Sequence, residues 1–300
     1  MKKELSILIP AYNYDCTQLV QGLCRQLSEM ASQGVKAEVI VAEDGSTDES
    51  ALTANADIAR WEHCRYIRRS ENVGRAAIRN FLARNAAYEW LLFLDCDMEL
   101  PDNMFVKRYL ENNGQAVIDG GFGVSENKAL EGRNLRYTYE WHAQDRHSLE
   151  QRRNNPYRSF RTTNFLVRRQ IMASIPFDER FRHYGYEDVL FGKRLKQQGV
   201  SIEHIDNPMM LSNVETNDIF VAKTEESLRT LYRFRDDLRG YSRLLTFVSG
   251  IHINSIKSAI RLWHKLLGPL EKRHLCSNHP TLRVFNIYKT GYYLSLTNND

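Results

Sequence analysis

Short apolar runs alternate with longer amphipathic stretches over the first two thirds of the chain. The short runs predict buried strands, and the stretches with apolar positions three and four residues apart predict helices. Strands that alternate with helices are typical of parallel sheets. The pattern therefore predicts a doubly wound α/β domain, with helices between strands at residues 5–10, 37–42, 64–68, 91–94, 116–118 and 162–167.

The clearest of these strands is 91–94, Leu-Leu-Phe-Leu, which runs into Asp95-Cys96-Asp97. An uninterrupted apolar run predicts a strand buried on both faces, and such strands hold ligands at their carboxyl ends. Asp95 and Asp97 leave the strand at that end, so both can reach one hard cation that also binds substrate phosphates. The pattern predicts a divalent metal site for a diphosphate. Two solvated aspartates in a turn are the simpler interpretation of so short a motif.

The first two strands end in residues that suit a nucleoside. The first strand stops at Pro10 and continues into Ala11 and Tyr12, and the second runs into Asp44. The carboxyl ends of parallel strands share one edge of the sheet, so we expect these residues beside Asp95. A flat aromatic ring and a carboxylate at that edge can contact a nucleobase. For Asp44 alone, an ordinary turn aspartate explains the pattern equally well.

The helices after the second and third strands begin with polar signals. Ser46 and Glu49 have the spacing of a capping box, which predicts the start of one helix. The next helix carries Arg75 and Arg79 near its start, one turn apart and close to the predicted position of Asp95. Either arginine could neutralise a phosphate or orient Asp95. Exposed arginines on a helix surface are the alternative.

A later helix is predicted to begin with two acids, Glu187 and Asp188, after Tyr184-Gly185-Tyr186. The helix dipole favours acids at this end, so the pair by itself carries little functional information. The apolar positions that we expect to face the core are Val189, Leu190, Phe191 and Leu195.

The last part of the chain differs in charge. Residues 240–300 carry eight Lys or Arg against two acids, a net charge of +6, which leaves −2 for the first 239 residues of a chain that totals +4. We expect residues 1–239 to form the catalytic domain and 240–300 a basic, mainly helical extension, in which Pro269 ends an amphipathic helix. Such a helix either packs on the catalytic domain or lies on a membrane surface, through apolar residues such as Phe247 and Trp263.

Bulk properties exclude several classes of protein. The composition is that of an ordinary soluble globular protein, and no uncharged apolar run is long enough to cross a bilayer. Five cysteines form no Cys-x-x-Cys pair and no signal sequence opens the chain, so we expect a cytoplasmic protein, peripheral at the inner face of the cell membrane if the tail binds lipid. The near-neutral main body argues against a nucleic-acid partner.

Five motifs together resemble glycosyltransferase family 2, of the kind that builds bacterial polysaccharides. They are Ile-Pro-Ala-Tyr-Asn, Ala-Glu-Asp-Gly-Ser-Thr-Asp, Asn-Val-Gly-Arg-Ala-Ala-Ile-Arg-Asn, Leu-Asp-Cys-Asp and Tyr-Gly-Tyr-Glu-Asp-Val-Leu-Phe-Gly, within residues 5–217. The resemblance implies a GT-A (Rossmann-like) fold, a mostly parallel sheet flanked by helices. It also implies inverting transfer of a sugar from a nucleotide-sugar donor, with a UDP-sugar favoured, to a glycan or lipid-linked acceptor, with Mn²⁺ or Mg²⁺ required.

The resemblance also implies a role for each matched residue. Ala11, Tyr12 and Asp44 would hold the nucleoside, and Asp95 and Asp97 the ribose and the metal-bound diphosphate. Asp188 would be the base that takes the proton of the acceptor hydroxyl, with Glu187 beside it in acceptor binding or structural support. The chemistry asks for the same groups, because a cation must stabilise the departing diphosphate and a carboxylate must activate the attacking hydroxyl.

One position departs from the family pattern. In similar proteins a histidine often follows the Asp-Asn-Pro sequence after the base helix and helps to bind the metal or diphosphate, whereas this chain has Leu211 at about that place after Asp206-Asn207-Pro208. The alternative consequences are weaker metal binding, a water in that position, or a loss of activity.

Two other interpretations remain open. A strand that ends in Asp95-Cys96-Asp97 also suits the aspartyl nucleophile of a haloacid-dehalogenase-like phosphatase, although that resemblance leaves the motifs around Tyr12 and Asp44 unexplained. The chain could also be a catalytically silent nucleotide-sugar-binding protein. The three interpretations differ in what the protein turns over: a glycosyltransferase uses a nucleotide sugar, a phosphatase uses a phosphoester, and a silent binding protein uses neither.

Overall fold

The computed structural model describes residues 1–211 and 213–297. The chain packs as two compact units. The first consists of Met1–Gly123, Arg146–Arg182 and Phe191–Asn213, and the second of Val124–Asp145, His183–Leu190 and Val214–Asp300. The predicted extension, residues 240–300, falls within the second unit, and the functional boundary after residue 239 stays a prediction.

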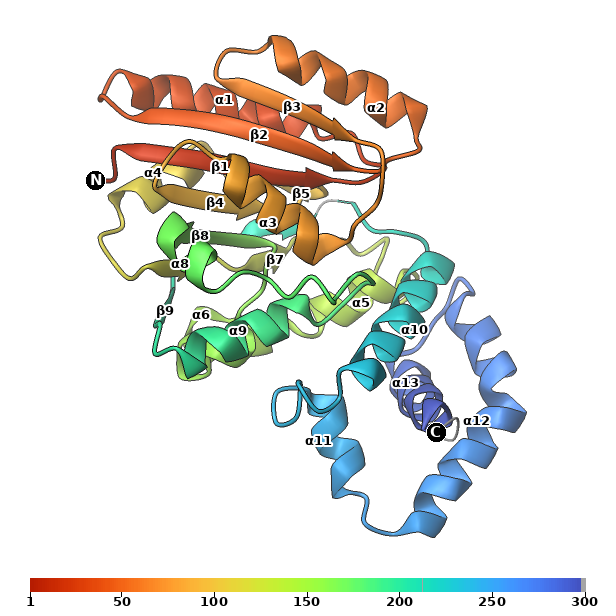
Figure 1. The fold of residues 1–300 in the computed structure, drawn as a ribbon. Coiled ribbons are helices and arrows are strands. Elements are labelled where there is room, and N and C mark those ends of the chain that lie inside the picture. The colour runs from red at the N-terminus through yellow and green to blue at the C-terminus, as the bar shows by residue number, and fades with distance from the viewer. Residues whose placement is uncertain (212, 298–300) are drawn as a thin grey trace. The chain divides into compact units, whose positions relative to one another are not determined.

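The first unit is built around a seven-stranded sheet (Figure 1). In spatial order the strands are β3 (Cys64–Arg69), β2 (Lys36–Asp44), β1 (Glu4–Ala11), β4 (Trp90–Leu94), β8 (Asn164–Arg168), β6 (Val117–Asp119) and β9 (Ile202–His204). Strands β1, β2, β3 and β4 are mutually parallel, β8 runs antiparallel to its neighbours β4 and β6, and β9 is parallel to β6. The predicted mostly parallel α/β sheet is confirmed.

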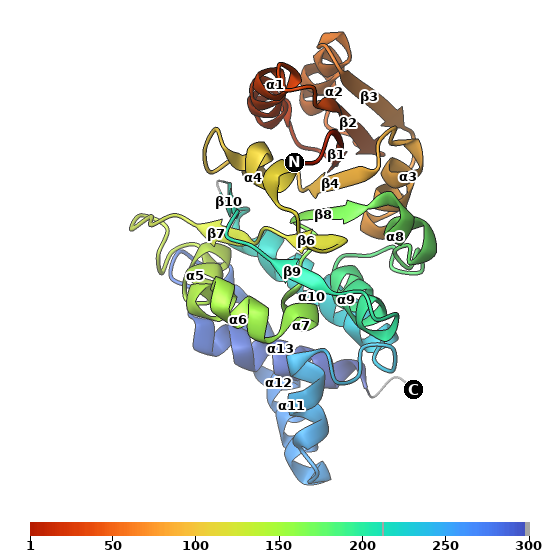
Figure 2. The ribbon, with the colours of Figure 1, turned by 90° about the vertical axis from the view of Figure 1, so that its left-hand side faces the viewer.

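Helices cover both faces of this sheet because its central strands are buried on both faces. All five residues of β4 are buried, and residues 38–44 of β2 are buried as well. Helices α1 (Thr17–Ala31) and α4 (Phe105–Glu111) lie on one face, and α3 (Arg75–Asn85) and α8 (Arg169–Ser174) on the other (Figure 2). Strands buried on both faces need this double cover.

A smaller sheet follows the end of β4. Its strands, in the order β5 (Met98–Glu99), β10 (Met209–Leu211) and β7 (Phe122–Val124), are short. Strand β10 pairs antiparallel with β5, and Leu211 lies opposite Met98. The sheet therefore brings Leu211 next to the residue that follows Asp97.

The remaining short elements connect the sheet strands. They are α2 (Glu49–Ala56), a 3-10 helix at Asp57–Arg60, a second at Gln144–His147, α6 (Leu149–Asn154), α7 (Pro156–Ser159) and α9 (Glu187–Gln197).

The capping box predicted at Ser46 and Glu49 is wrong. The N-cap of α2 is Asp48, whose side chain accepts hydrogen bonds from the N–H groups of Ser50 and Ala51. Asp48 directly precedes the helix and its carboxylate reaches two free N–H groups of the first turn. Ser46 instead donates to Glu43.

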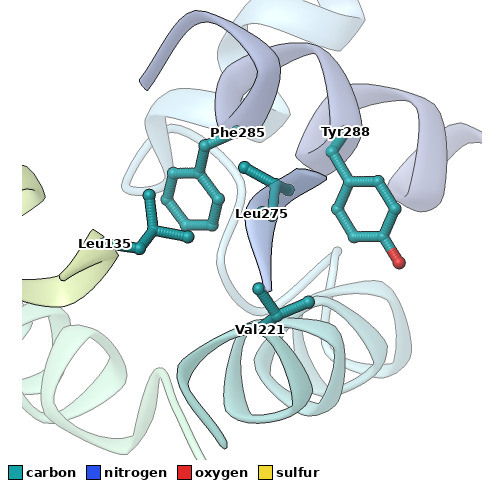
Figure 3. Packing of buried hydrophobic residues seen from close by; sticks show 5 residues of the cluster. All are labelled: Leu135, Val221, Leu275, Phe285 and Tyr288. Atoms are coloured by element: carbon teal, nitrogen blue, oxygen red, sulfur yellow. The ribbon is translucent and has the colours of Figure 1, made fainter. Parts of the chain in front are cut away.

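The second unit is helical. Its helices are α5 (Leu135–Trp141), α10 (Asn217–Arg233), α11 (Arg243–Gly250), α12 (Asn254–Leu275) and α13 (Leu282–Leu296). Helix α13 packs against both α10 and α12. The core that joins α5, α10, α12 and α13 is aromatic and aliphatic, with Leu135, Val221, Leu275, Phe285 and Tyr288 in contact (Figure 3).

The prediction that Pro269 ends the amphipathic helix is wrong, because α12 continues through Pro269 to Leu275. An interior proline costs about 3 kcal/mol, since it removes one hydrogen bond and crowds the preceding turn. The turns on either side of it are held by tertiary packing: Gly268 is buried and Leu275 is fully buried in the core with α13. Burial of the downstream turn offsets the local cost.

Candidate functional site

Three acidic or aromatic strand ends meet at one edge of the large sheet. In the parallel register Ala11 of β1 pairs with Glu43 of β2, and Leu8 of β1 pairs with Phe93 of β4. Asp44 is thus the last residue of β2, and Tyr12 and Asp95 directly follow β1 and β4. The strand ends that the sequence predicted to share an edge do share it.

The loop after β1 presents Tyr12, which is half-exposed at 50%. Ala11 is buried and Pro10 half-buried at the end of β1, so at this edge Ala11 offers its backbone rather than its side chain. Asn13 holds the loop in place: its Oδ1 accepts hydrogen bonds from the N–H groups of Thr47 (2.7 Å) and Asp48 (2.9 Å). The loops after β1 and β2 therefore form one connected structure.

Asp44 is buried and already has two backbone partners. Its carboxylate accepts hydrogen bonds from the N–H groups of Val73 and Gly74, both at 3.0 Å. Burial raises the pKa of Asp44, against the opposing effect of these two N–H groups. Gly74 has φ +89°, and a Cβ there would lie 2.4 Å from the carbonyl oxygen of Arg182, so only glycine fits. Asp44 thus fixes the turn that begins α3.

Two arginines on α3 hold Asp95. Arg75 Nη2 lies 2.9 Å from Oδ2 of Asp95, and Arg79 Nη2 lies 2.5 Å from Oδ1. Burial alone would raise the pKa of Asp95, but the two guanidinium groups outweigh it and hold this pKa below its ordinary value. Both arginines thus bind Asp95 and set its orientation, which is one of the roles that the sequence left open.

Asp97 lies half-buried in the turn between β4 and β5. The pKa of the nearby Tyr14 is raised by burial and further by the negative charges of Asp97 and Glu99, so the turn is acidic. Among residues 1–211 and 213–297, no three His, Cys, Asp or Glu side chains are grouped as a metal cage. A site with one or two carboxylates fits Mg²⁺ or Mn²⁺, hard cations that take further oxygens from substrate phosphates. The donor set therefore suits a cation that binds together with a diphosphate.

Leu211 lies at about the place where the sequence resemblance implies a histidine. It is buried at 7% exposure and faces Met98 across the β5–β10 pair, one residue beyond Asp97. The departure noted in the sequence is therefore located beside the acidic turn, where an aliphatic side chain provides no metal ligand.

Glu187 and Asp188 belong to the second unit and open α9 as predicted. Glu187 is buried at 5% exposure, whereas Asp188 is half-buried and its Oδ1 accepts a hydrogen bond from the N–H of Val189 (2.8 Å). Gly185 and Tyr186 both have positive φ, +98° and +68°, so the chain turns sharply into the helix. The helix dipole and this N–H group favour the ionised form of Asp188.

The core face of α9 is largely as expected. Leu190, Phe191 and Leu195 are buried, and Val189 is half-buried.

Two supporting residues were missed by the sequence analysis. Glu43 is fully buried beside Asp44, and its Oε1 accepts hydrogen bonds from Asn55 Nδ2 (2.8 Å) and Tyr66 Oη (3.2 Å). Asn80 on α3 bonds both the N–H and the carbonyl oxygen of Phe177, each at 2.9 Å. Two signals in the sequence could have identified them: Glu43 is a charged residue at the end of an apolar strand, and Asn80 is an amide in the middle of a helix.

With this geometry in view, similarity to known proteins becomes informative. The model of the glycosyl transferase family 2 matches residues 6–175. The chain belongs to that family. The match includes Tyr12, Asp44, Asp95 and Asp97 and stops before Glu187.

The chain is similar in sequence to two bacterial synthases. The chain is 27% identical over 239 residues to a chondroitin synthase of Pasteurella multocida, covering 68% of this chain and 24% of that protein. It is 27% identical over 207 residues to a hyaluronan synthase of Pasteurella multocida, covering 57% of this chain and 21% of that protein. The chain thus spans about a quarter of the length of these relatives.

Solved structures of the GT-A type share the fold. The mannosyltransferase PcManGT from Pyrobaculum calidifontis, in complex with GDP-Man and Mn²⁺, aligns with a TM-score of 0.54 and 12% identity over 100% of this chain and 89% of its own. S. aureus TarS 1–349 aligns with a TM-score of 0.52 and 15% identity over 99% of this chain and 91% of its own. At such identities the likeness concerns the fold, and it agrees with the GT-A expectation.

Proposed function

We propose that the protein is an inverting glycosyltransferase. It moves a hexosyl or N-acetylhexosaminyl group from a nucleoside-diphosphate donor, with a UDP-sugar favoured, to a hydroxyl of a glycan or lipid-linked acceptor. The observation that carries the proposal is the shared sheet edge, where Tyr12, Asp44 and Asp95 end three adjacent strands and Asp97 follows. Nucleotide ligands of open α/β sheets bind outside the carboxyl ends of the strands.

The related proteins support this choice of donor and product. TarS has also been crystallised with UDP-GlcNAc, at a TM-score of 0.50 to this chain, and PcManGT with GDP-Man and Mn²⁺. The matched relatives are named as synthases of chondroitin and hyaluronan, which are glycans. A nucleotide-sugar donor and a growing glycan acceptor are therefore the substrates we propose here.

Each residue at the edge has a proposed task. The exposed ring of Tyr12 packs against the nucleobase, and Asp44, fixed by the N–H groups of Val73 and Gly74, accepts a hydrogen bond from the base edge. Asp95 is held ionised by two arginines and accepts hydrogen bonds from the ribose hydroxyls. Its orientation is set before the donor arrives, which removes an ordering cost from binding.

Asp97 is the carboxylate that we assign to the metal, with Asp95 next to it in the same turn. Both oxygens of Asp95 are already engaged by guanidinium groups, so a cation at that carboxylate would meet two positive charges. Mn²⁺ or Mg²⁺, when bound with the donor, supplies Lewis-acid stabilisation of the negative charge on the departing diphosphate. The part of the protein would be to hold that cation through the Asp97 carboxylate.

Asp188 is the proposed general base. Its carboxylate takes the proton of the acceptor hydroxyl while that oxygen forms a bond to the anomeric carbon, and the bond from this carbon to the diphosphate oxygen breaks on the opposite face. One displacement of this kind inverts the anomeric centre. Glu187, which is buried whereas Asp188 is half-buried, is assigned to acceptor binding or to support of the helix start.

The experiment that tests this function measures nucleotide release from a panel of UDP-, GDP- and dTDP-sugars with Mn²⁺, in parallel with hydrolysis of a generic phosphoester. We expect release from one donor class, stimulated by an oligosaccharide acceptor, and no phosphoester hydrolysis. Phosphoester turnover would instead support the phosphatase interpretation. Donor binding without release, with any acceptor tried, would support a silent binding protein.

A further inference from the structure

The outer face of α12 exposes an apolar stripe. Leu262, Leu266 and Leu270 follow at four-residue steps, with Trp263 beside them, and these side chains are 57%, 66%, 62% and 50% exposed. Residues three and four apart lie on one face of a helix, so the four form one continuous surface. Soluble proteins rarely leave such a patch without a partner.

The exposed stripe is separate from the packed side of α12, because the opposite face of this helix packs on α13. The side chains turned inward include Leu275, which is fully buried, and His264, whose ring lies between Gly268 and Gly291. A Cβ at Gly291 would come within 2.7 Å of the His264 Cβ, so the two helices approach closely there. Helix α12 is therefore apolar on two sides, one packed and one exposed.

The exposed apolar surface is concentrated in this part of the chain. Seven of the twelve large apolar side chains that are exposed in the described residues fall between residues 247 and 270. The other three, besides Leu262, Trp263, Leu266 and Leu270, are Phe247, Ile253 and Ile256. The concentration marks a surface rather than the scattered exposure of an ordinary exterior.

Positive charge borders the stripe on one side, while on the other the indole N–H of Trp263 donates to Glu271 Oε1 (2.7 Å). A groove of about 550 Å³ on α12 and α13 is lined by Arg261 and Lys265, with the hydroxyls of Ser258 and Ser295 and the edge of Leu262. Arg261 is anchored there by hydrogen bonds to the Leu294 carbonyl (3.1 Å) and the Thr297 hydroxyl (2.7 Å). Cations and hydroxyls beside an apolar surface suit a phosphate that is attached to a hydrocarbon chain.

We propose that this face of α12 docks on an anionic lipid bilayer, with the leucine stripe and Trp263 in the interface and the Arg261–Lys265 groove on headgroup phosphates. Charge selects this occupant: residues 240–300 carry eight Lys or Arg against two acids, which attracts an anionic surface and opposes a second copy of the same face. Basic amphipathic helices of this composition lie in the plane of a membrane surface. No helix in the described residues is long and apolar enough to cross one.

The test is binding of the full chain to vesicles of phosphatidylcholine, alone or mixed with phosphatidylglycerol, at low and high salt. We expect binding to the mixed vesicles that weakens with salt, and a blue shift of tryptophan emission that is lost in Trp263→Phe. Leu266→Glu should weaken binding roughly tenfold or more, and Lys265→Ala about fivefold. Ile287→Glu and Arg283→Ala, which change exposed side chains on α13, are the matched controls and should bind nearly as the wild type does.

Two results would overturn the proposal. Equal binding to both kinds of vesicle, unchanged in Leu266→Glu, would show that the stripe does not recognise an anionic surface. A dimer in light scattering that Leu266→Glu dissociates, without any vesicle binding by the wild type, would assign the stripe to a second copy of the chain. Donor binding at the sheet edge is measured separately and decides neither outcome.

Discussion

Arg79 and Asp95 form a buried ion pair between α3 and the end of β4: the two charged groups lie 2.5 Å apart, and the arginine side chain is 1% exposed. Arg75 binds the other oxygen of the same carboxylate but is 37% exposed. One carboxylate thus joins a buried and a partly solvated arginine. The pair fixes the position of Asp95 before any ligand binds.

Removal of the buried arginine should destabilise the fold. In Arg79→Met, the Asp95 carboxylate loses its fully desolvated partner, and we expect the free energy of unfolding to fall by about 3 kcal/mol. Arg75→Met is the matched control and should lose much less, because solvent screens the exposed pair. Urea unfolding of both variants measures the difference. Equal losses would contradict the assignment of Arg79 as the main support of Asp95.

The same pair predicts a pH dependence. The pKa of Asp95 in the folded chain lies below its ordinary value of 3.8, so its contribution to stability is present above that value and is lost as the pH falls through the folded-state pKa. Wild type should therefore lose stability faster than Asp95→Asn as the pH falls below about 4. Unfolding curves over a pH series measure the gap between them. A gap that stays constant into strong acid would show that Asp95 is not ionised in the folded state.

The position of Leu211 beside the acidic turn predicts a gain-of-ligand variant. Leu211→His should raise the apparent affinity for Mn²⁺ in the presence of UDP by roughly tenfold, because an imidazole is added opposite Met98, the residue that follows Asp97. Met210→His is the control, since adjacent residues of a strand point to opposite faces. Calorimetry of Mn²⁺ binding in saturating UDP compares the two. An equal effect of both substitutions would contradict the placement of Leu211 at the metal.

The proposed base predicts a separation of binding from turnover. Asp188→Asn keeps the size of the side chain and removes its basicity, so transfer should fall by a factor on the order of 10² to 10⁴ with donor affinity nearly unchanged. Glu187→Gln should cost less in turnover and more in apparent acceptor affinity. Rates at saturating donor over a range of pH give the comparison. Turnover close to wild type in Asp188→Asn would remove Asp188 from the mechanism.

The sheet and its ligand edge were predictable because their signals are strong and local. The run 91–94 has no polar residue, so its burial and the exit of Asp95 and Asp97 from the sheet followed directly. The antiparallel direction of β8 was not predictable, since an apolar run has no inherent direction. The positions of Asp44 and Tyr12 followed from the order of strands and helices.

Other features depended on contacts between distant segments. The sequence left the roles of Arg75 and Arg79 open, because their partner is chosen by how α3 packs on the sheet. Asn13 gave no signal, since its bonds are to a loop more than thirty residues away. The choice of Asp48 over Ser46 as N-cap depended on where α2 begins, a boundary that patterns locate poorly.

The prediction that a helix ends at Pro269 failed for a similar reason. Pro269 is a strong local signal for a helix end, yet α12 continues because Leu275 is buried in a core that the sequence pattern does not reveal. Tertiary packing outweighs local preference when the downstream turn has a large buried side chain.

The most direct test of the account is calorimetric titration of UDP with and without Mn²⁺ into wild type, Asp97→Asn and Glu99→Gln. Glu99 lies two residues beyond Asp97 in the same acidic turn and is exposed, so it controls for a general loss of negative charge. We predict that Mn²⁺ strengthens UDP binding in wild type and in Glu99→Gln, and that Asp97→Asn abolishes the strengthening. If Mn²⁺ strengthens UDP binding equally in Asp97→Asn, the sheet edge at Asp97 does not hold the metal-bound diphosphate and the central claim is wrong.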